Sequence, residues 1–275
     1  MQQKKSLVAS GNNISKPIIR TNKFTRYYRI SRIILHTMVG FIIAGIMLPF
    51  TSKPLKLKLI SWWCKHLLGV FNIGVIYTGN VPQNPQSLQN CLVVANHISW
   101  ADIHALTSII PVRFIAKSEI RTWPIFGYLA NKANALFIDR AKRHDVAKTV
   151  NSTKLSLIAG DNICLFPEGT TTDGTELKVF KGSLIQAAIE AKSTILPVVI
   201  RYALPDGSPN IEAAYAGETT LPESMQLMLS QKNPIVSLLF LSPIPLESVV
   251  NRHFDRRSLT LHLEGLIRQE LGFIR

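Results

Sequence analysis

Two residues in this chain are suited to proton transfer, because a histidine and an aspartate, His97 and Asp102, lie five positions apart in the segment N-H-I-S-W-A-D. The apolar run before them, 91–95, predicts a strand, and strand ends are the usual place for function in an α/β sheet. If the following turn leads into a helix, Asp102 can accept a hydrogen bond from one ring nitrogen and leave the other as a base. The chain has no G-x-S-x-G motif, so the pair suits direct activation of a substrate hydroxyl.

Structural roles compete with this interpretation. Asp102 can simply cap the helix that follows it, and His97 can be a buried histidine with no role in chemistry. The spacing alone favours these structural roles. Their weight falls because other unusual polar segments recur downstream, each at the end of a predicted strand.

Three further segments place polar residues after predicted strands. Lys117 can face an anionic group, unless it is an ordinary exposed lysine. Arg140 is a natural bidentate partner for phosphate, unless it pairs with Asp139 at the surface. The segment F-P-E-G-T at 166–170 can wrap backbone N–H groups around an oxyanion or phosphate, although P-E-G is also ordinary turn chemistry.

The chain alternates short apolar runs with helical periodicity from residue 91 onward. The runs that predict strands are 91–95, 112–116, 135–138, 163–166, 195–200 and 236–241. Helices are predicted at 144–159, 181–192 and 256–271, and a long loop or an excursion from the domain at 205–222. This alternation predicts an α/β fold with a mixed, mostly buried sheet flanked by helices.

The N-terminal third is both basic and apolar. Residues 1–101 hold twelve Lys and Arg and no acidic residue, whereas the remainder holds nineteen basic and seventeen acidic residues. Two apolar segments, 33–50 and 59–77, lie among these basic groups, and each Lys or Arg near an anionic membrane adds about 1 kcal/mol of attraction. The segments suit a helical pair that dips into one leaflet, with a single membrane span as the competing interpretation. Burial of both segments in the globular domain is less favoured, because no acidic residue there balances the basic flanks.

The three cysteines indicate a reducing compartment rather than a disulfide framework. Cys64, Cys91 and Cys164 all lie in apolar contexts, and no pair has the spacing of metal ligands. We therefore expect packed, free thiols.

Four motifs, taken in order, resemble the blocks of the lysophospholipid acyltransferase family. They are N-H-x4-D at 96–102, K-x-E-x4-P-x2-G at 117–127, F-P-E-G-T at 166–170 and I-L-P-V at 195–198. The first and third are specific, and the second and fourth are loose. The resemblance implies a glycerolipid acyltransferase-like fold and divides the chain into a disordered basic tail (1–28), membrane-anchoring helices (29–78) and an acyltransferase catalytic domain (79–275).

The resemblance also implies a mechanism. His97 takes the proton of the acceptor hydroxyl, Asp102 orients His97, and the hydroxyl oxygen attacks the thioester of acyl-CoA or acyl-carrier protein. No cofactor is implied beyond this acyl donor, and no catalytic metal is implied. The residues implied to hold the acceptor's polar head are Lys117, Arg140, Phe166, Pro167, Glu168, Gly169 and Thr170.

The first acceptor implied by the family is 1-acyl-sn-glycerol-3-phosphate, which gives phosphatidic acid. The implied location is a bacterial inner membrane, with the catalytic domain facing the cytoplasm. One departure favours a different acceptor, because many family members follow F-P-E-G-T with an arginine where this chain has Thr171. A charged hydrogen bond is worth about 1.5–3 kcal/mol, so its loss favours lyso-ornithine lipids or related lysolipids as alternatives.

Two hypotheses from other classes remain. A non-catalytic membrane lipid-binding protein would need only the basic helices and a lipid groove, but it gains little from a His–Asp pair. Nucleic-acid binding rests on the net charge of +14 alone and lacks a recognisable motif, so we expect no nucleic-acid partner.

Overall fold

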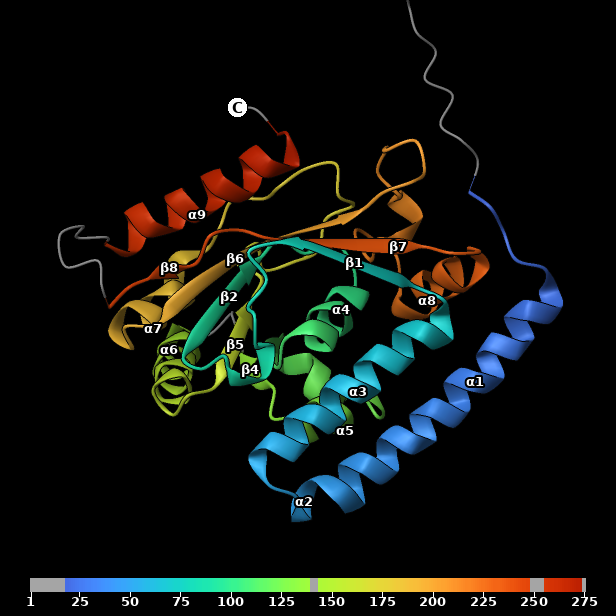
Figure 1. Cartoon of the computed structure of the whole chain (residues 1–275), viewed down its shortest axis with the longest axis horizontal. Helices are drawn as coiled ribbons and strands as arrows, with labels where there is room; N and C mark the ends of the chain where they lie inside the picture. The colour runs from blue at the N-terminus through green and yellow to red at the C-terminus, as the bar shows by residue number, and fades with distance from the viewer. Residues whose placement is uncertain (1–17, 139–142, 248–254, 274–275) are drawn as a thin grey trace, which may run out of the picture.

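The computed structural model describes residues 18–138, 143–247 and 255–273. Within these ranges a single mixed sheet forms the centre of the molecule (Figure 1). Its order is β1-β7-β6-β2-β5-β3-β4, and β8 pairs with β6. The strands are β1 (Gly74–Gly79), β2 (Cys91–Ala95), β3 (Arg113–Lys117), β4 (Leu136–Ile138), β5 (Asn162–Leu165), β6 (Thr194–Tyr202), β7 (Ile235–Phe240) and β8 (Ile244–Pro245).

The five strands β4, β3, β5, β2 and β6 run parallel, so their carboxyl ends lie at one edge of the sheet. Strand β7 is antiparallel to β6, and β1 is parallel to β7. The central strand β2 is completely buried along its length. The predicted fold, a mixed and mostly buried sheet flanked by helices, is therefore confirmed.

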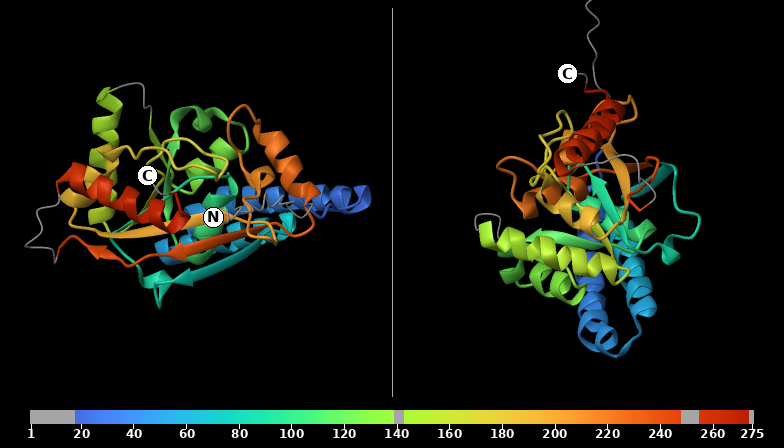
Figure 2. Two further views of the ribbon diagram at one scale, coloured as in Figure 1. Left: turned by 90° about the horizontal axis from the view of Figure 1, so that it is seen from above. Right: turned by 90° about the vertical axis from the view of Figure 1, so that its left-hand side faces the viewer.

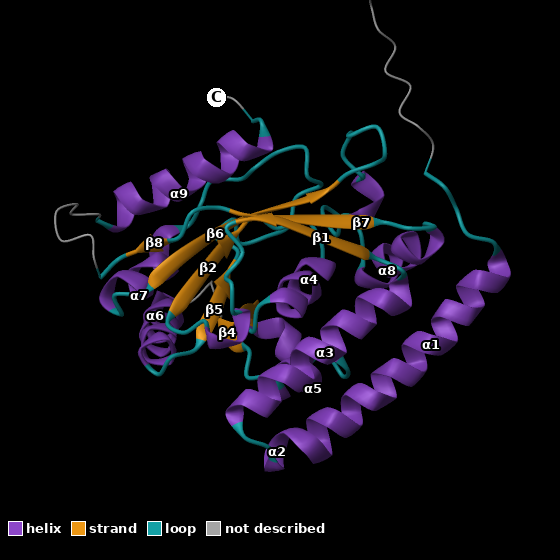
Figure 3. Cartoon of the chain, viewed as in Figure 1, coloured by secondary structure: helices purple, strands orange, loops and turns teal. Residues whose placement is uncertain are grey.

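Helices cover both faces of the sheet (Figures 1 and 3). Alternation along β2 separates two cores, with Val93 in one and Leu92 in the other. The first core takes side chains from α3 (Lys53–Phe71), α4 (Ala101–Ile109) and α8 (Leu221–Ser230). The second takes them from α6 (Arg143–Ile158), α7 (Ile185–Glu190) and α9 (Arg256–Leu271). Shorter elements are α5 (Phe126–Lys132) and the 3-10 turns η2 (Pro85–Ser87), η3 (Ser118–Thr122), η4 (Gly182–Leu184) and η5 (Ile211–Ala213).

The end of the second predicted anchor helix is wrong. The apolar segment 59–77 is not one helix, because α3 ends at Asn72 in the left-handed region (φ 58°) and edge strand β1 follows. Strand β1 pairs with β7, so the predicted anchor 29–78 includes a strand of the sheet. The segment 205–222, predicted as a long loop or an excursion, contains η5 and ends at the start of α8, whose first turn is fixed by a capping box between Thr220 and Glu223.

The N-terminal helix is longer than predicted. Helix α1 (Lys23–Ile42) continues through a π-helical turn, η1 (Ile43–Met47), into α2 (Leu48–Phe50). It begins six residues before the predicted boundary of the tail, because the Asn22 side chain caps it by accepting the N–H of Thr25. Residues 18–22 are tied to the end of α8, where the Thr21 N–H donates to the carbonyl of Ser230 at 2.8 Å. Residues 1–17 of the predicted tail lie outside the described residues.

The continuous helix Lys23–Phe50 is long and apolar enough to cross a membrane, with a mean hydropathy of 2.2 over its most apolar window. Only 28% of that window is buried, so most of its surface is exposed. Figure 2 shows α1 and α3 as a pair extending from one side of the α/β domain.

A reciprocal contact holds α1 against α3. The imidazole Nε2 of His36 lies 3.0 Å from the carbonyl oxygen of Trp63, and the indole N–H of Trp63 donates to the carbonyl of His36 at 3.1 Å. The two rings also stack with centroids 5.0 Å apart. Gly40 allows this approach, since a Cβ there would lie 2.6 Å from the indole nitrogen.

A buried arginine joins the helical pair to the α/β domain. The Arg29 guanidinium donates to the carbonyls of Leu229, Gln231 and Lys232 at 3.0, 2.7 and 2.9 Å. These carbonyls lie at and just beyond the C-terminus of α8, where unpaired acceptors and the helix dipole both favour a cation.

We predict that Arg29→Ala lowers the free energy of unfolding by about 2–3 kcal/mol, because hydrogen bonds to a buried cation are lost and carbonyls are left unpaired. Thermal unfolding in detergent, followed by circular dichroism, measures the effect. Arg32→Ala is the matched control, since Arg32 is exposed on the same helix and lies over the Tyr28 ring. Equal melting temperatures for the two variants would show that the Arg29 contact does not hold α1 to α8.

Candidate active site

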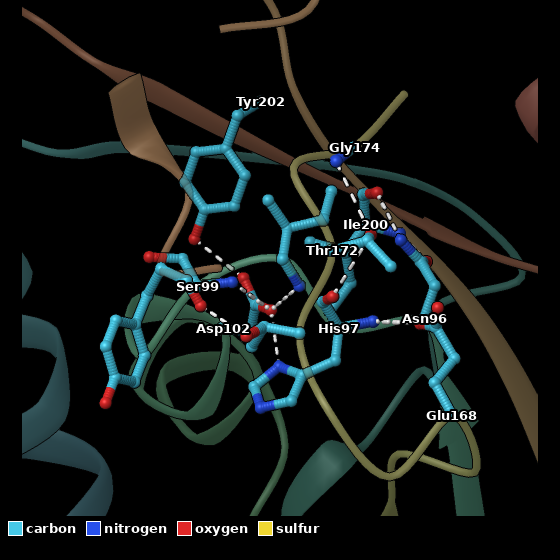
Figure 4. A network of polar contacts seen from close by, with 12 residues as sticks. Asn96, His97, Ser99, Asp102, Glu168, Thr172, Gly174, Ile200 and Tyr202 are labelled. Carbon is cyan, nitrogen blue, oxygen red and sulfur yellow. Dashed lines mark hydrogen bonds and ion pairs between the residues drawn. The ribbon is translucent and has the colours of Figure 1, made fainter. Parts of the chain in front are cut away.

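The sheet topology brings the predicted site residues together. Strand β2 has β5 and β6 as parallel neighbours, and His97 and Phe166 follow the carboxyl ends of β2 and β5. Tyr202 is the last residue of β6, and Figure 4 shows it near His97. This edge of an α/β sheet is where ligands usually bind. Asn96 fixes the distance between the ends of β2 and β6, because its amide donates to the Ile200 carbonyl at 2.9 Å and accepts the Ile200 N–H at 2.8 Å.

His97 and Asp102 form the predicted hydrogen bond. Asp102 lies in the first turn of α4, is completely buried, and its Oδ2 is 2.8 Å from Nδ1 of His97. The same oxygen accepts the backbone N–H groups of Ile98 at 2.7 Å and Ser99 at 2.9 Å. Asp102 therefore shapes the turn and orients the imidazole at once, so its structural and functional roles coexist.

The His97 ring is held on its face as well as at its edge. It stacks on Phe166 with centroids 3.8 Å apart and an angle of 5° between the planes. The side chain keeps 17% of its surface exposed. Among the described residues Nε2 has no hydrogen-bond partner, so this nitrogen is free to accept a proton from an incoming hydroxyl.

Glu168 fixes the backbone on the other side of His97. Its two carboxylate oxygens accept the backbone N–H groups of His97 at 2.8 Å and Lys178 at 3.0 Å. Only 3% of the residue is exposed, and this burial raises the pKa of Glu168 to about 7 although both N–H groups oppose the shift. In this structure Glu168 shapes the site from beneath the loop.

The loop that follows Glu168 is fixed to three other segments. Thr172 donates its N–H to the His97 carbonyl at 2.9 Å, and the Thr171 hydroxyl donates to the Tyr215 carbonyl. From helix α9, Glu264 accepts the N–H of Phe180 at 2.9 Å. No sequence pattern predicts that the C-terminal helix supports the site, because that contact joins segments 84 residues apart.

The residues predicted to hold the acceptor's head lie at different depths. Glu168 and the two residues before it, Phe166 and Pro167, are buried, whereas Thr170 and Lys117 are exposed. Gly169 lies between them and adopts a φ of 78°, which a side chain would strain. Arg140 lies outside the described residues, and contact of any of these residues with substrate stays a prediction.

No thiol is placed to act as a nucleophile. Burial raises the pKa of Cys64 and of Cys91 to about 12, and the pKa of Cys164 well above its usual value. All three thiols are therefore protonated at neutral pH, and the thiol is a poor nucleophile compared with the thiolate.

We predict that Glu168 makes the stability of the protein fall as the pH rises. Since its pKa is raised from 4.5 to about 7 on folding, its contribution is complete below pH 4.5 and is lost as the pH rises through about 7. This loss amounts to at most about 3 kcal/mol. Unfolding at a series of pH values should show a steeper decline for the wild type than for Glu168→Gln, which has no carboxyl to titrate. Parallel declines would contradict the assignment.

The comparisons with known proteins agree with this geometry. The family described as Acyltransferase matches residues 75–201. The lyso-ornithine lipid O-acyltransferase of Pseudomonas aeruginosa is 35% identical over 219 residues, which cover 79% of this chain and 80% of that protein. The 1-acyl-sn-glycerol-3-phosphate acyltransferase of Neisseria gonorrhoeae is 34% identical over 176 residues, 64% of this chain and 68% of that protein.

A solved structure shows the same fold. The crystal structure of the 1-acyl-sn-glycerophosphate acyltransferase from Thermotoga maritima superposes with a TM-score of 0.60 at 21% identity, covering 89% of this chain and 96% of that one. The sequence relatives carry more weight for function, since the Pseudomonas aeruginosa protein is 35% identical over 79% of this chain. The chain belongs to the acyltransferase family of lysolipid-acylating enzymes, as the resemblance of its motifs predicted.

Proposed function

We propose that this acyltransferase moves a fatty acyl group from acyl-CoA or acyl-carrier protein to the hydroxyl of a lysolipid, with His97 as the general base. The proton of the hydroxyl passes to Nε2 while the oxygen bonds to the thioester carbonyl carbon. Collapse of the tetrahedral intermediate breaks the carbon–sulfur bond, and the imidazolium returns the proton to the leaving thiolate. The bond between His97 and Asp102 carries this proposal, because it fixes Nδ1 as the donor and leaves Nε2 as the base.

The buried thiols support direct transfer between the two substrates. A covalent acyl-enzyme needs an activated nucleophile beside a base, and the three cysteines of the chain are buried and protonated. Transfer then requires the donor thioester and the acceptor hydroxyl at the site together.

We propose a lyso-ornithine lipid as the preferred acceptor. The relative from Pseudomonas aeruginosa, which matches four fifths of its own length, carries that name. The Thr171 hydroxyl supports this choice, since it bonds to a backbone carbonyl and cannot replace an arginine as a phosphate ligand. The second candidate is 1-acyl-sn-glycerol-3-phosphate, the first acceptor that the resemblance implied. The Neisseria gonorrhoeae relative and the exposed Lys117 and Lys178 favour it, because these lysines can meet a phosphate.

Purified protein supplied with radiolabelled acyl-CoA or acyl-carrier protein and a panel of lysolipids tests the proposal. We expect acylated ornithine lipid to form faster than phosphatidic acid, with mass spectrometry identifying each product. His97→Ala should lower the rate about 10²–10⁴-fold, the usual contribution of a general base, while vesicle binding stays at the wild-type level.

His262→Ala is the matched control, because His262 is exposed on α9 and lies outside the site described above. A near wild-type rate for His97→Ala would refute the mechanism. Vesicle binding without thiol release for any lysolipid would instead favour a non-catalytic lipid-binding protein. Faster formation of phosphatidic acid would make 1-acyl-sn-glycerol-3-phosphate the preferred acceptor and would leave the proposed mechanism unchanged.

We further propose that α1 and α3 anchor the enzyme in one leaflet of the inner membrane, with the catalytic domain facing the cytoplasm where acyl donors are made. Apolar side chains recur every three or four residues along one side of the long helix, at Leu35, Met38, Ile42, Ile46 and Phe50, and all are exposed. Basic Lys53, Lys56 and Lys58 follow. This pattern is typical of a helix that lies at the surface of an anionic membrane.

The attachment of both ends of the pair supports one leaflet over a span. The start of α1 is bonded to α8 through Arg29, and the end of α3 leads directly into β1. The inner side of α3 is part of the protein core through Leu67, Leu68 and Phe71. The chain therefore leaves and re-enters the same side of the catalytic domain.

An N-terminal epitope tag reports the topology. We expect protease to remove the tag from inverted inner-membrane vesicles, where it also digests the catalytic domain, and to spare both in intact spheroplasts. Removal of the tag from spheroplasts would establish a span instead. An unrelated periplasm-facing tag on a known membrane protein verifies the orientation of each preparation.

A further inference from the structure

Tyr202 completes the environment of Asp102 from the neighbouring strand β6. It is the last residue of β6, and its hydroxyl donates to Oδ1 of Asp102 at 2.7 Å (Figure 4). The tyrosine is 3% exposed and the aspartate 0%. No other donor to Oδ1 occurs within the described ranges, whereas Oδ2 has the three described above.

Four donors around one buried carboxylate match its ionised form, which only accepts hydrogen bonds. Without the phenol, Oδ1 would be left in a dry environment with no partner, a loss that buried charges tolerate poorly. The phenol therefore satisfies the oxygen that the turn at 97–99 cannot reach.

The backbone makes Tyr202 a rigid donor. Its carbonyl accepts the N–H of Asn210 at 2.9 Å, and it lies opposite Val236 in the antiparallel ladder with β7. The Asn96–Ile200 amide pair locks the end of β6 to the end of β2, which carries His97. Burial and the Asp102 charge raise the pKa of Tyr202 well above its usual value, so it donates instead of ionising.

We propose that Tyr202 is a positioning residue for acyl transfer, whose hydroxyl holds the Asp102 carboxylate with Oδ2 directed at His97. This role rests on the proposed function of His97 as the base. The competing possibility is that Tyr202 only fills the core, where its ring is one member of the cluster on the α4 side of the sheet. The positioning role requires that Asp102 transmits the effect of Tyr202 to His97, whereas the structural role does not.

A double-mutant cycle between Tyr202→Phe and Asp102→Asn separates the two possibilities. If Tyr202 acts through Asp102, Tyr202→Phe should lower kcat about tenfold with KM unchanged, and should lower it less than about twofold in the Asp102→Asn background. A purely structural role would give the same fold-loss in both backgrounds. Radiolabelled acyl donor makes the low residual rates measurable, and Tyr128→Phe, whose ring stacks on Phe41 away from the site, is the control.

The pH–rate profile gives a second readout. Loss of the donor should move the acid side of the profile to higher pH, and 3-fluorotyrosine incorporated at Tyr202, a stronger donor that keeps the ring, should move it to lower pH. The other titratable groups that face Asp102 are His97, Glu168 and Cys164, and they are the same in all these proteins. The fluorinated protein also provides the test if Tyr202→Phe fails to fold.

Unchanged kcat and an unchanged profile in folded Tyr202→Phe would overturn the proposal. So would equal losses in the two backgrounds of the cycle. Its failure is distinguishable from failure of the base assignment, because His97→Ala then still abolishes transfer. If His97→Ala is active, the base assignment and the role of Tyr202 fail together.

Discussion

The structure depends on one buried negative charge whose hydrogen bonds are all satisfied. A carboxylate removed from water is costly unless donors surround it, and Asp102 has four of them. These donors come from the turn after β2 and from the end of β6, segments 100 residues apart. The charge can therefore be buried only when both strands lie side by side in the sheet, so folding and assembly of the base are the same event.

Two buried carboxylates divide the work of holding His97. Asp102 binds the ring nitrogen, while Glu168 binds the backbone N–H of the same residue and links it to the loop at Lys178. Their environments differ, because Asp102 has four donors and Glu168 has two, with burial raising the pKa of Glu168 to about 7. The stacked ring of Phe166 removes the remaining freedom of the imidazole. What stays open is Nε2, which is the atom that the proposed chemistry needs.

Much of this arrangement was predictable because it is local. The strand 91–95, the helix 256–271 and the His97–Asp102 bond each follow from spacing and periodicity. The partners that depend on strand order were not predictable, since nothing in one sequence states that Tyr202 lies beside Asp102 or that Glu264 lies beside Phe180. Residues 73–77 were predicted to continue the anchor helix, but most of them belong to edge strand β1. Both structures accept a short apolar run, so composition alone does not distinguish them. The burial of Glu168 and its bonds to the backbone of His97 and Lys178 were not predictable either, because they join segments far apart in the chain.

The location of the base links its chemistry to the anchoring helices. Helix α3 packs on α4, the helix that carries Asp102, so the proposed membrane anchor and the His97 turn form one continuous body.

The central claim is that the His97 imidazole carries its proton on Nδ1 and offers Nε2 to the acceptor. Nitrogen-15 NMR of histidine-labelled protein, with the His97 signals assigned by their absence in a variant, measures that tautomer directly. The account predicts a protonated Nδ1 and a bare Nε2 at neutral pH in the enzyme without substrate, and a proton on Nε2 with a bare Nδ1 would contradict it.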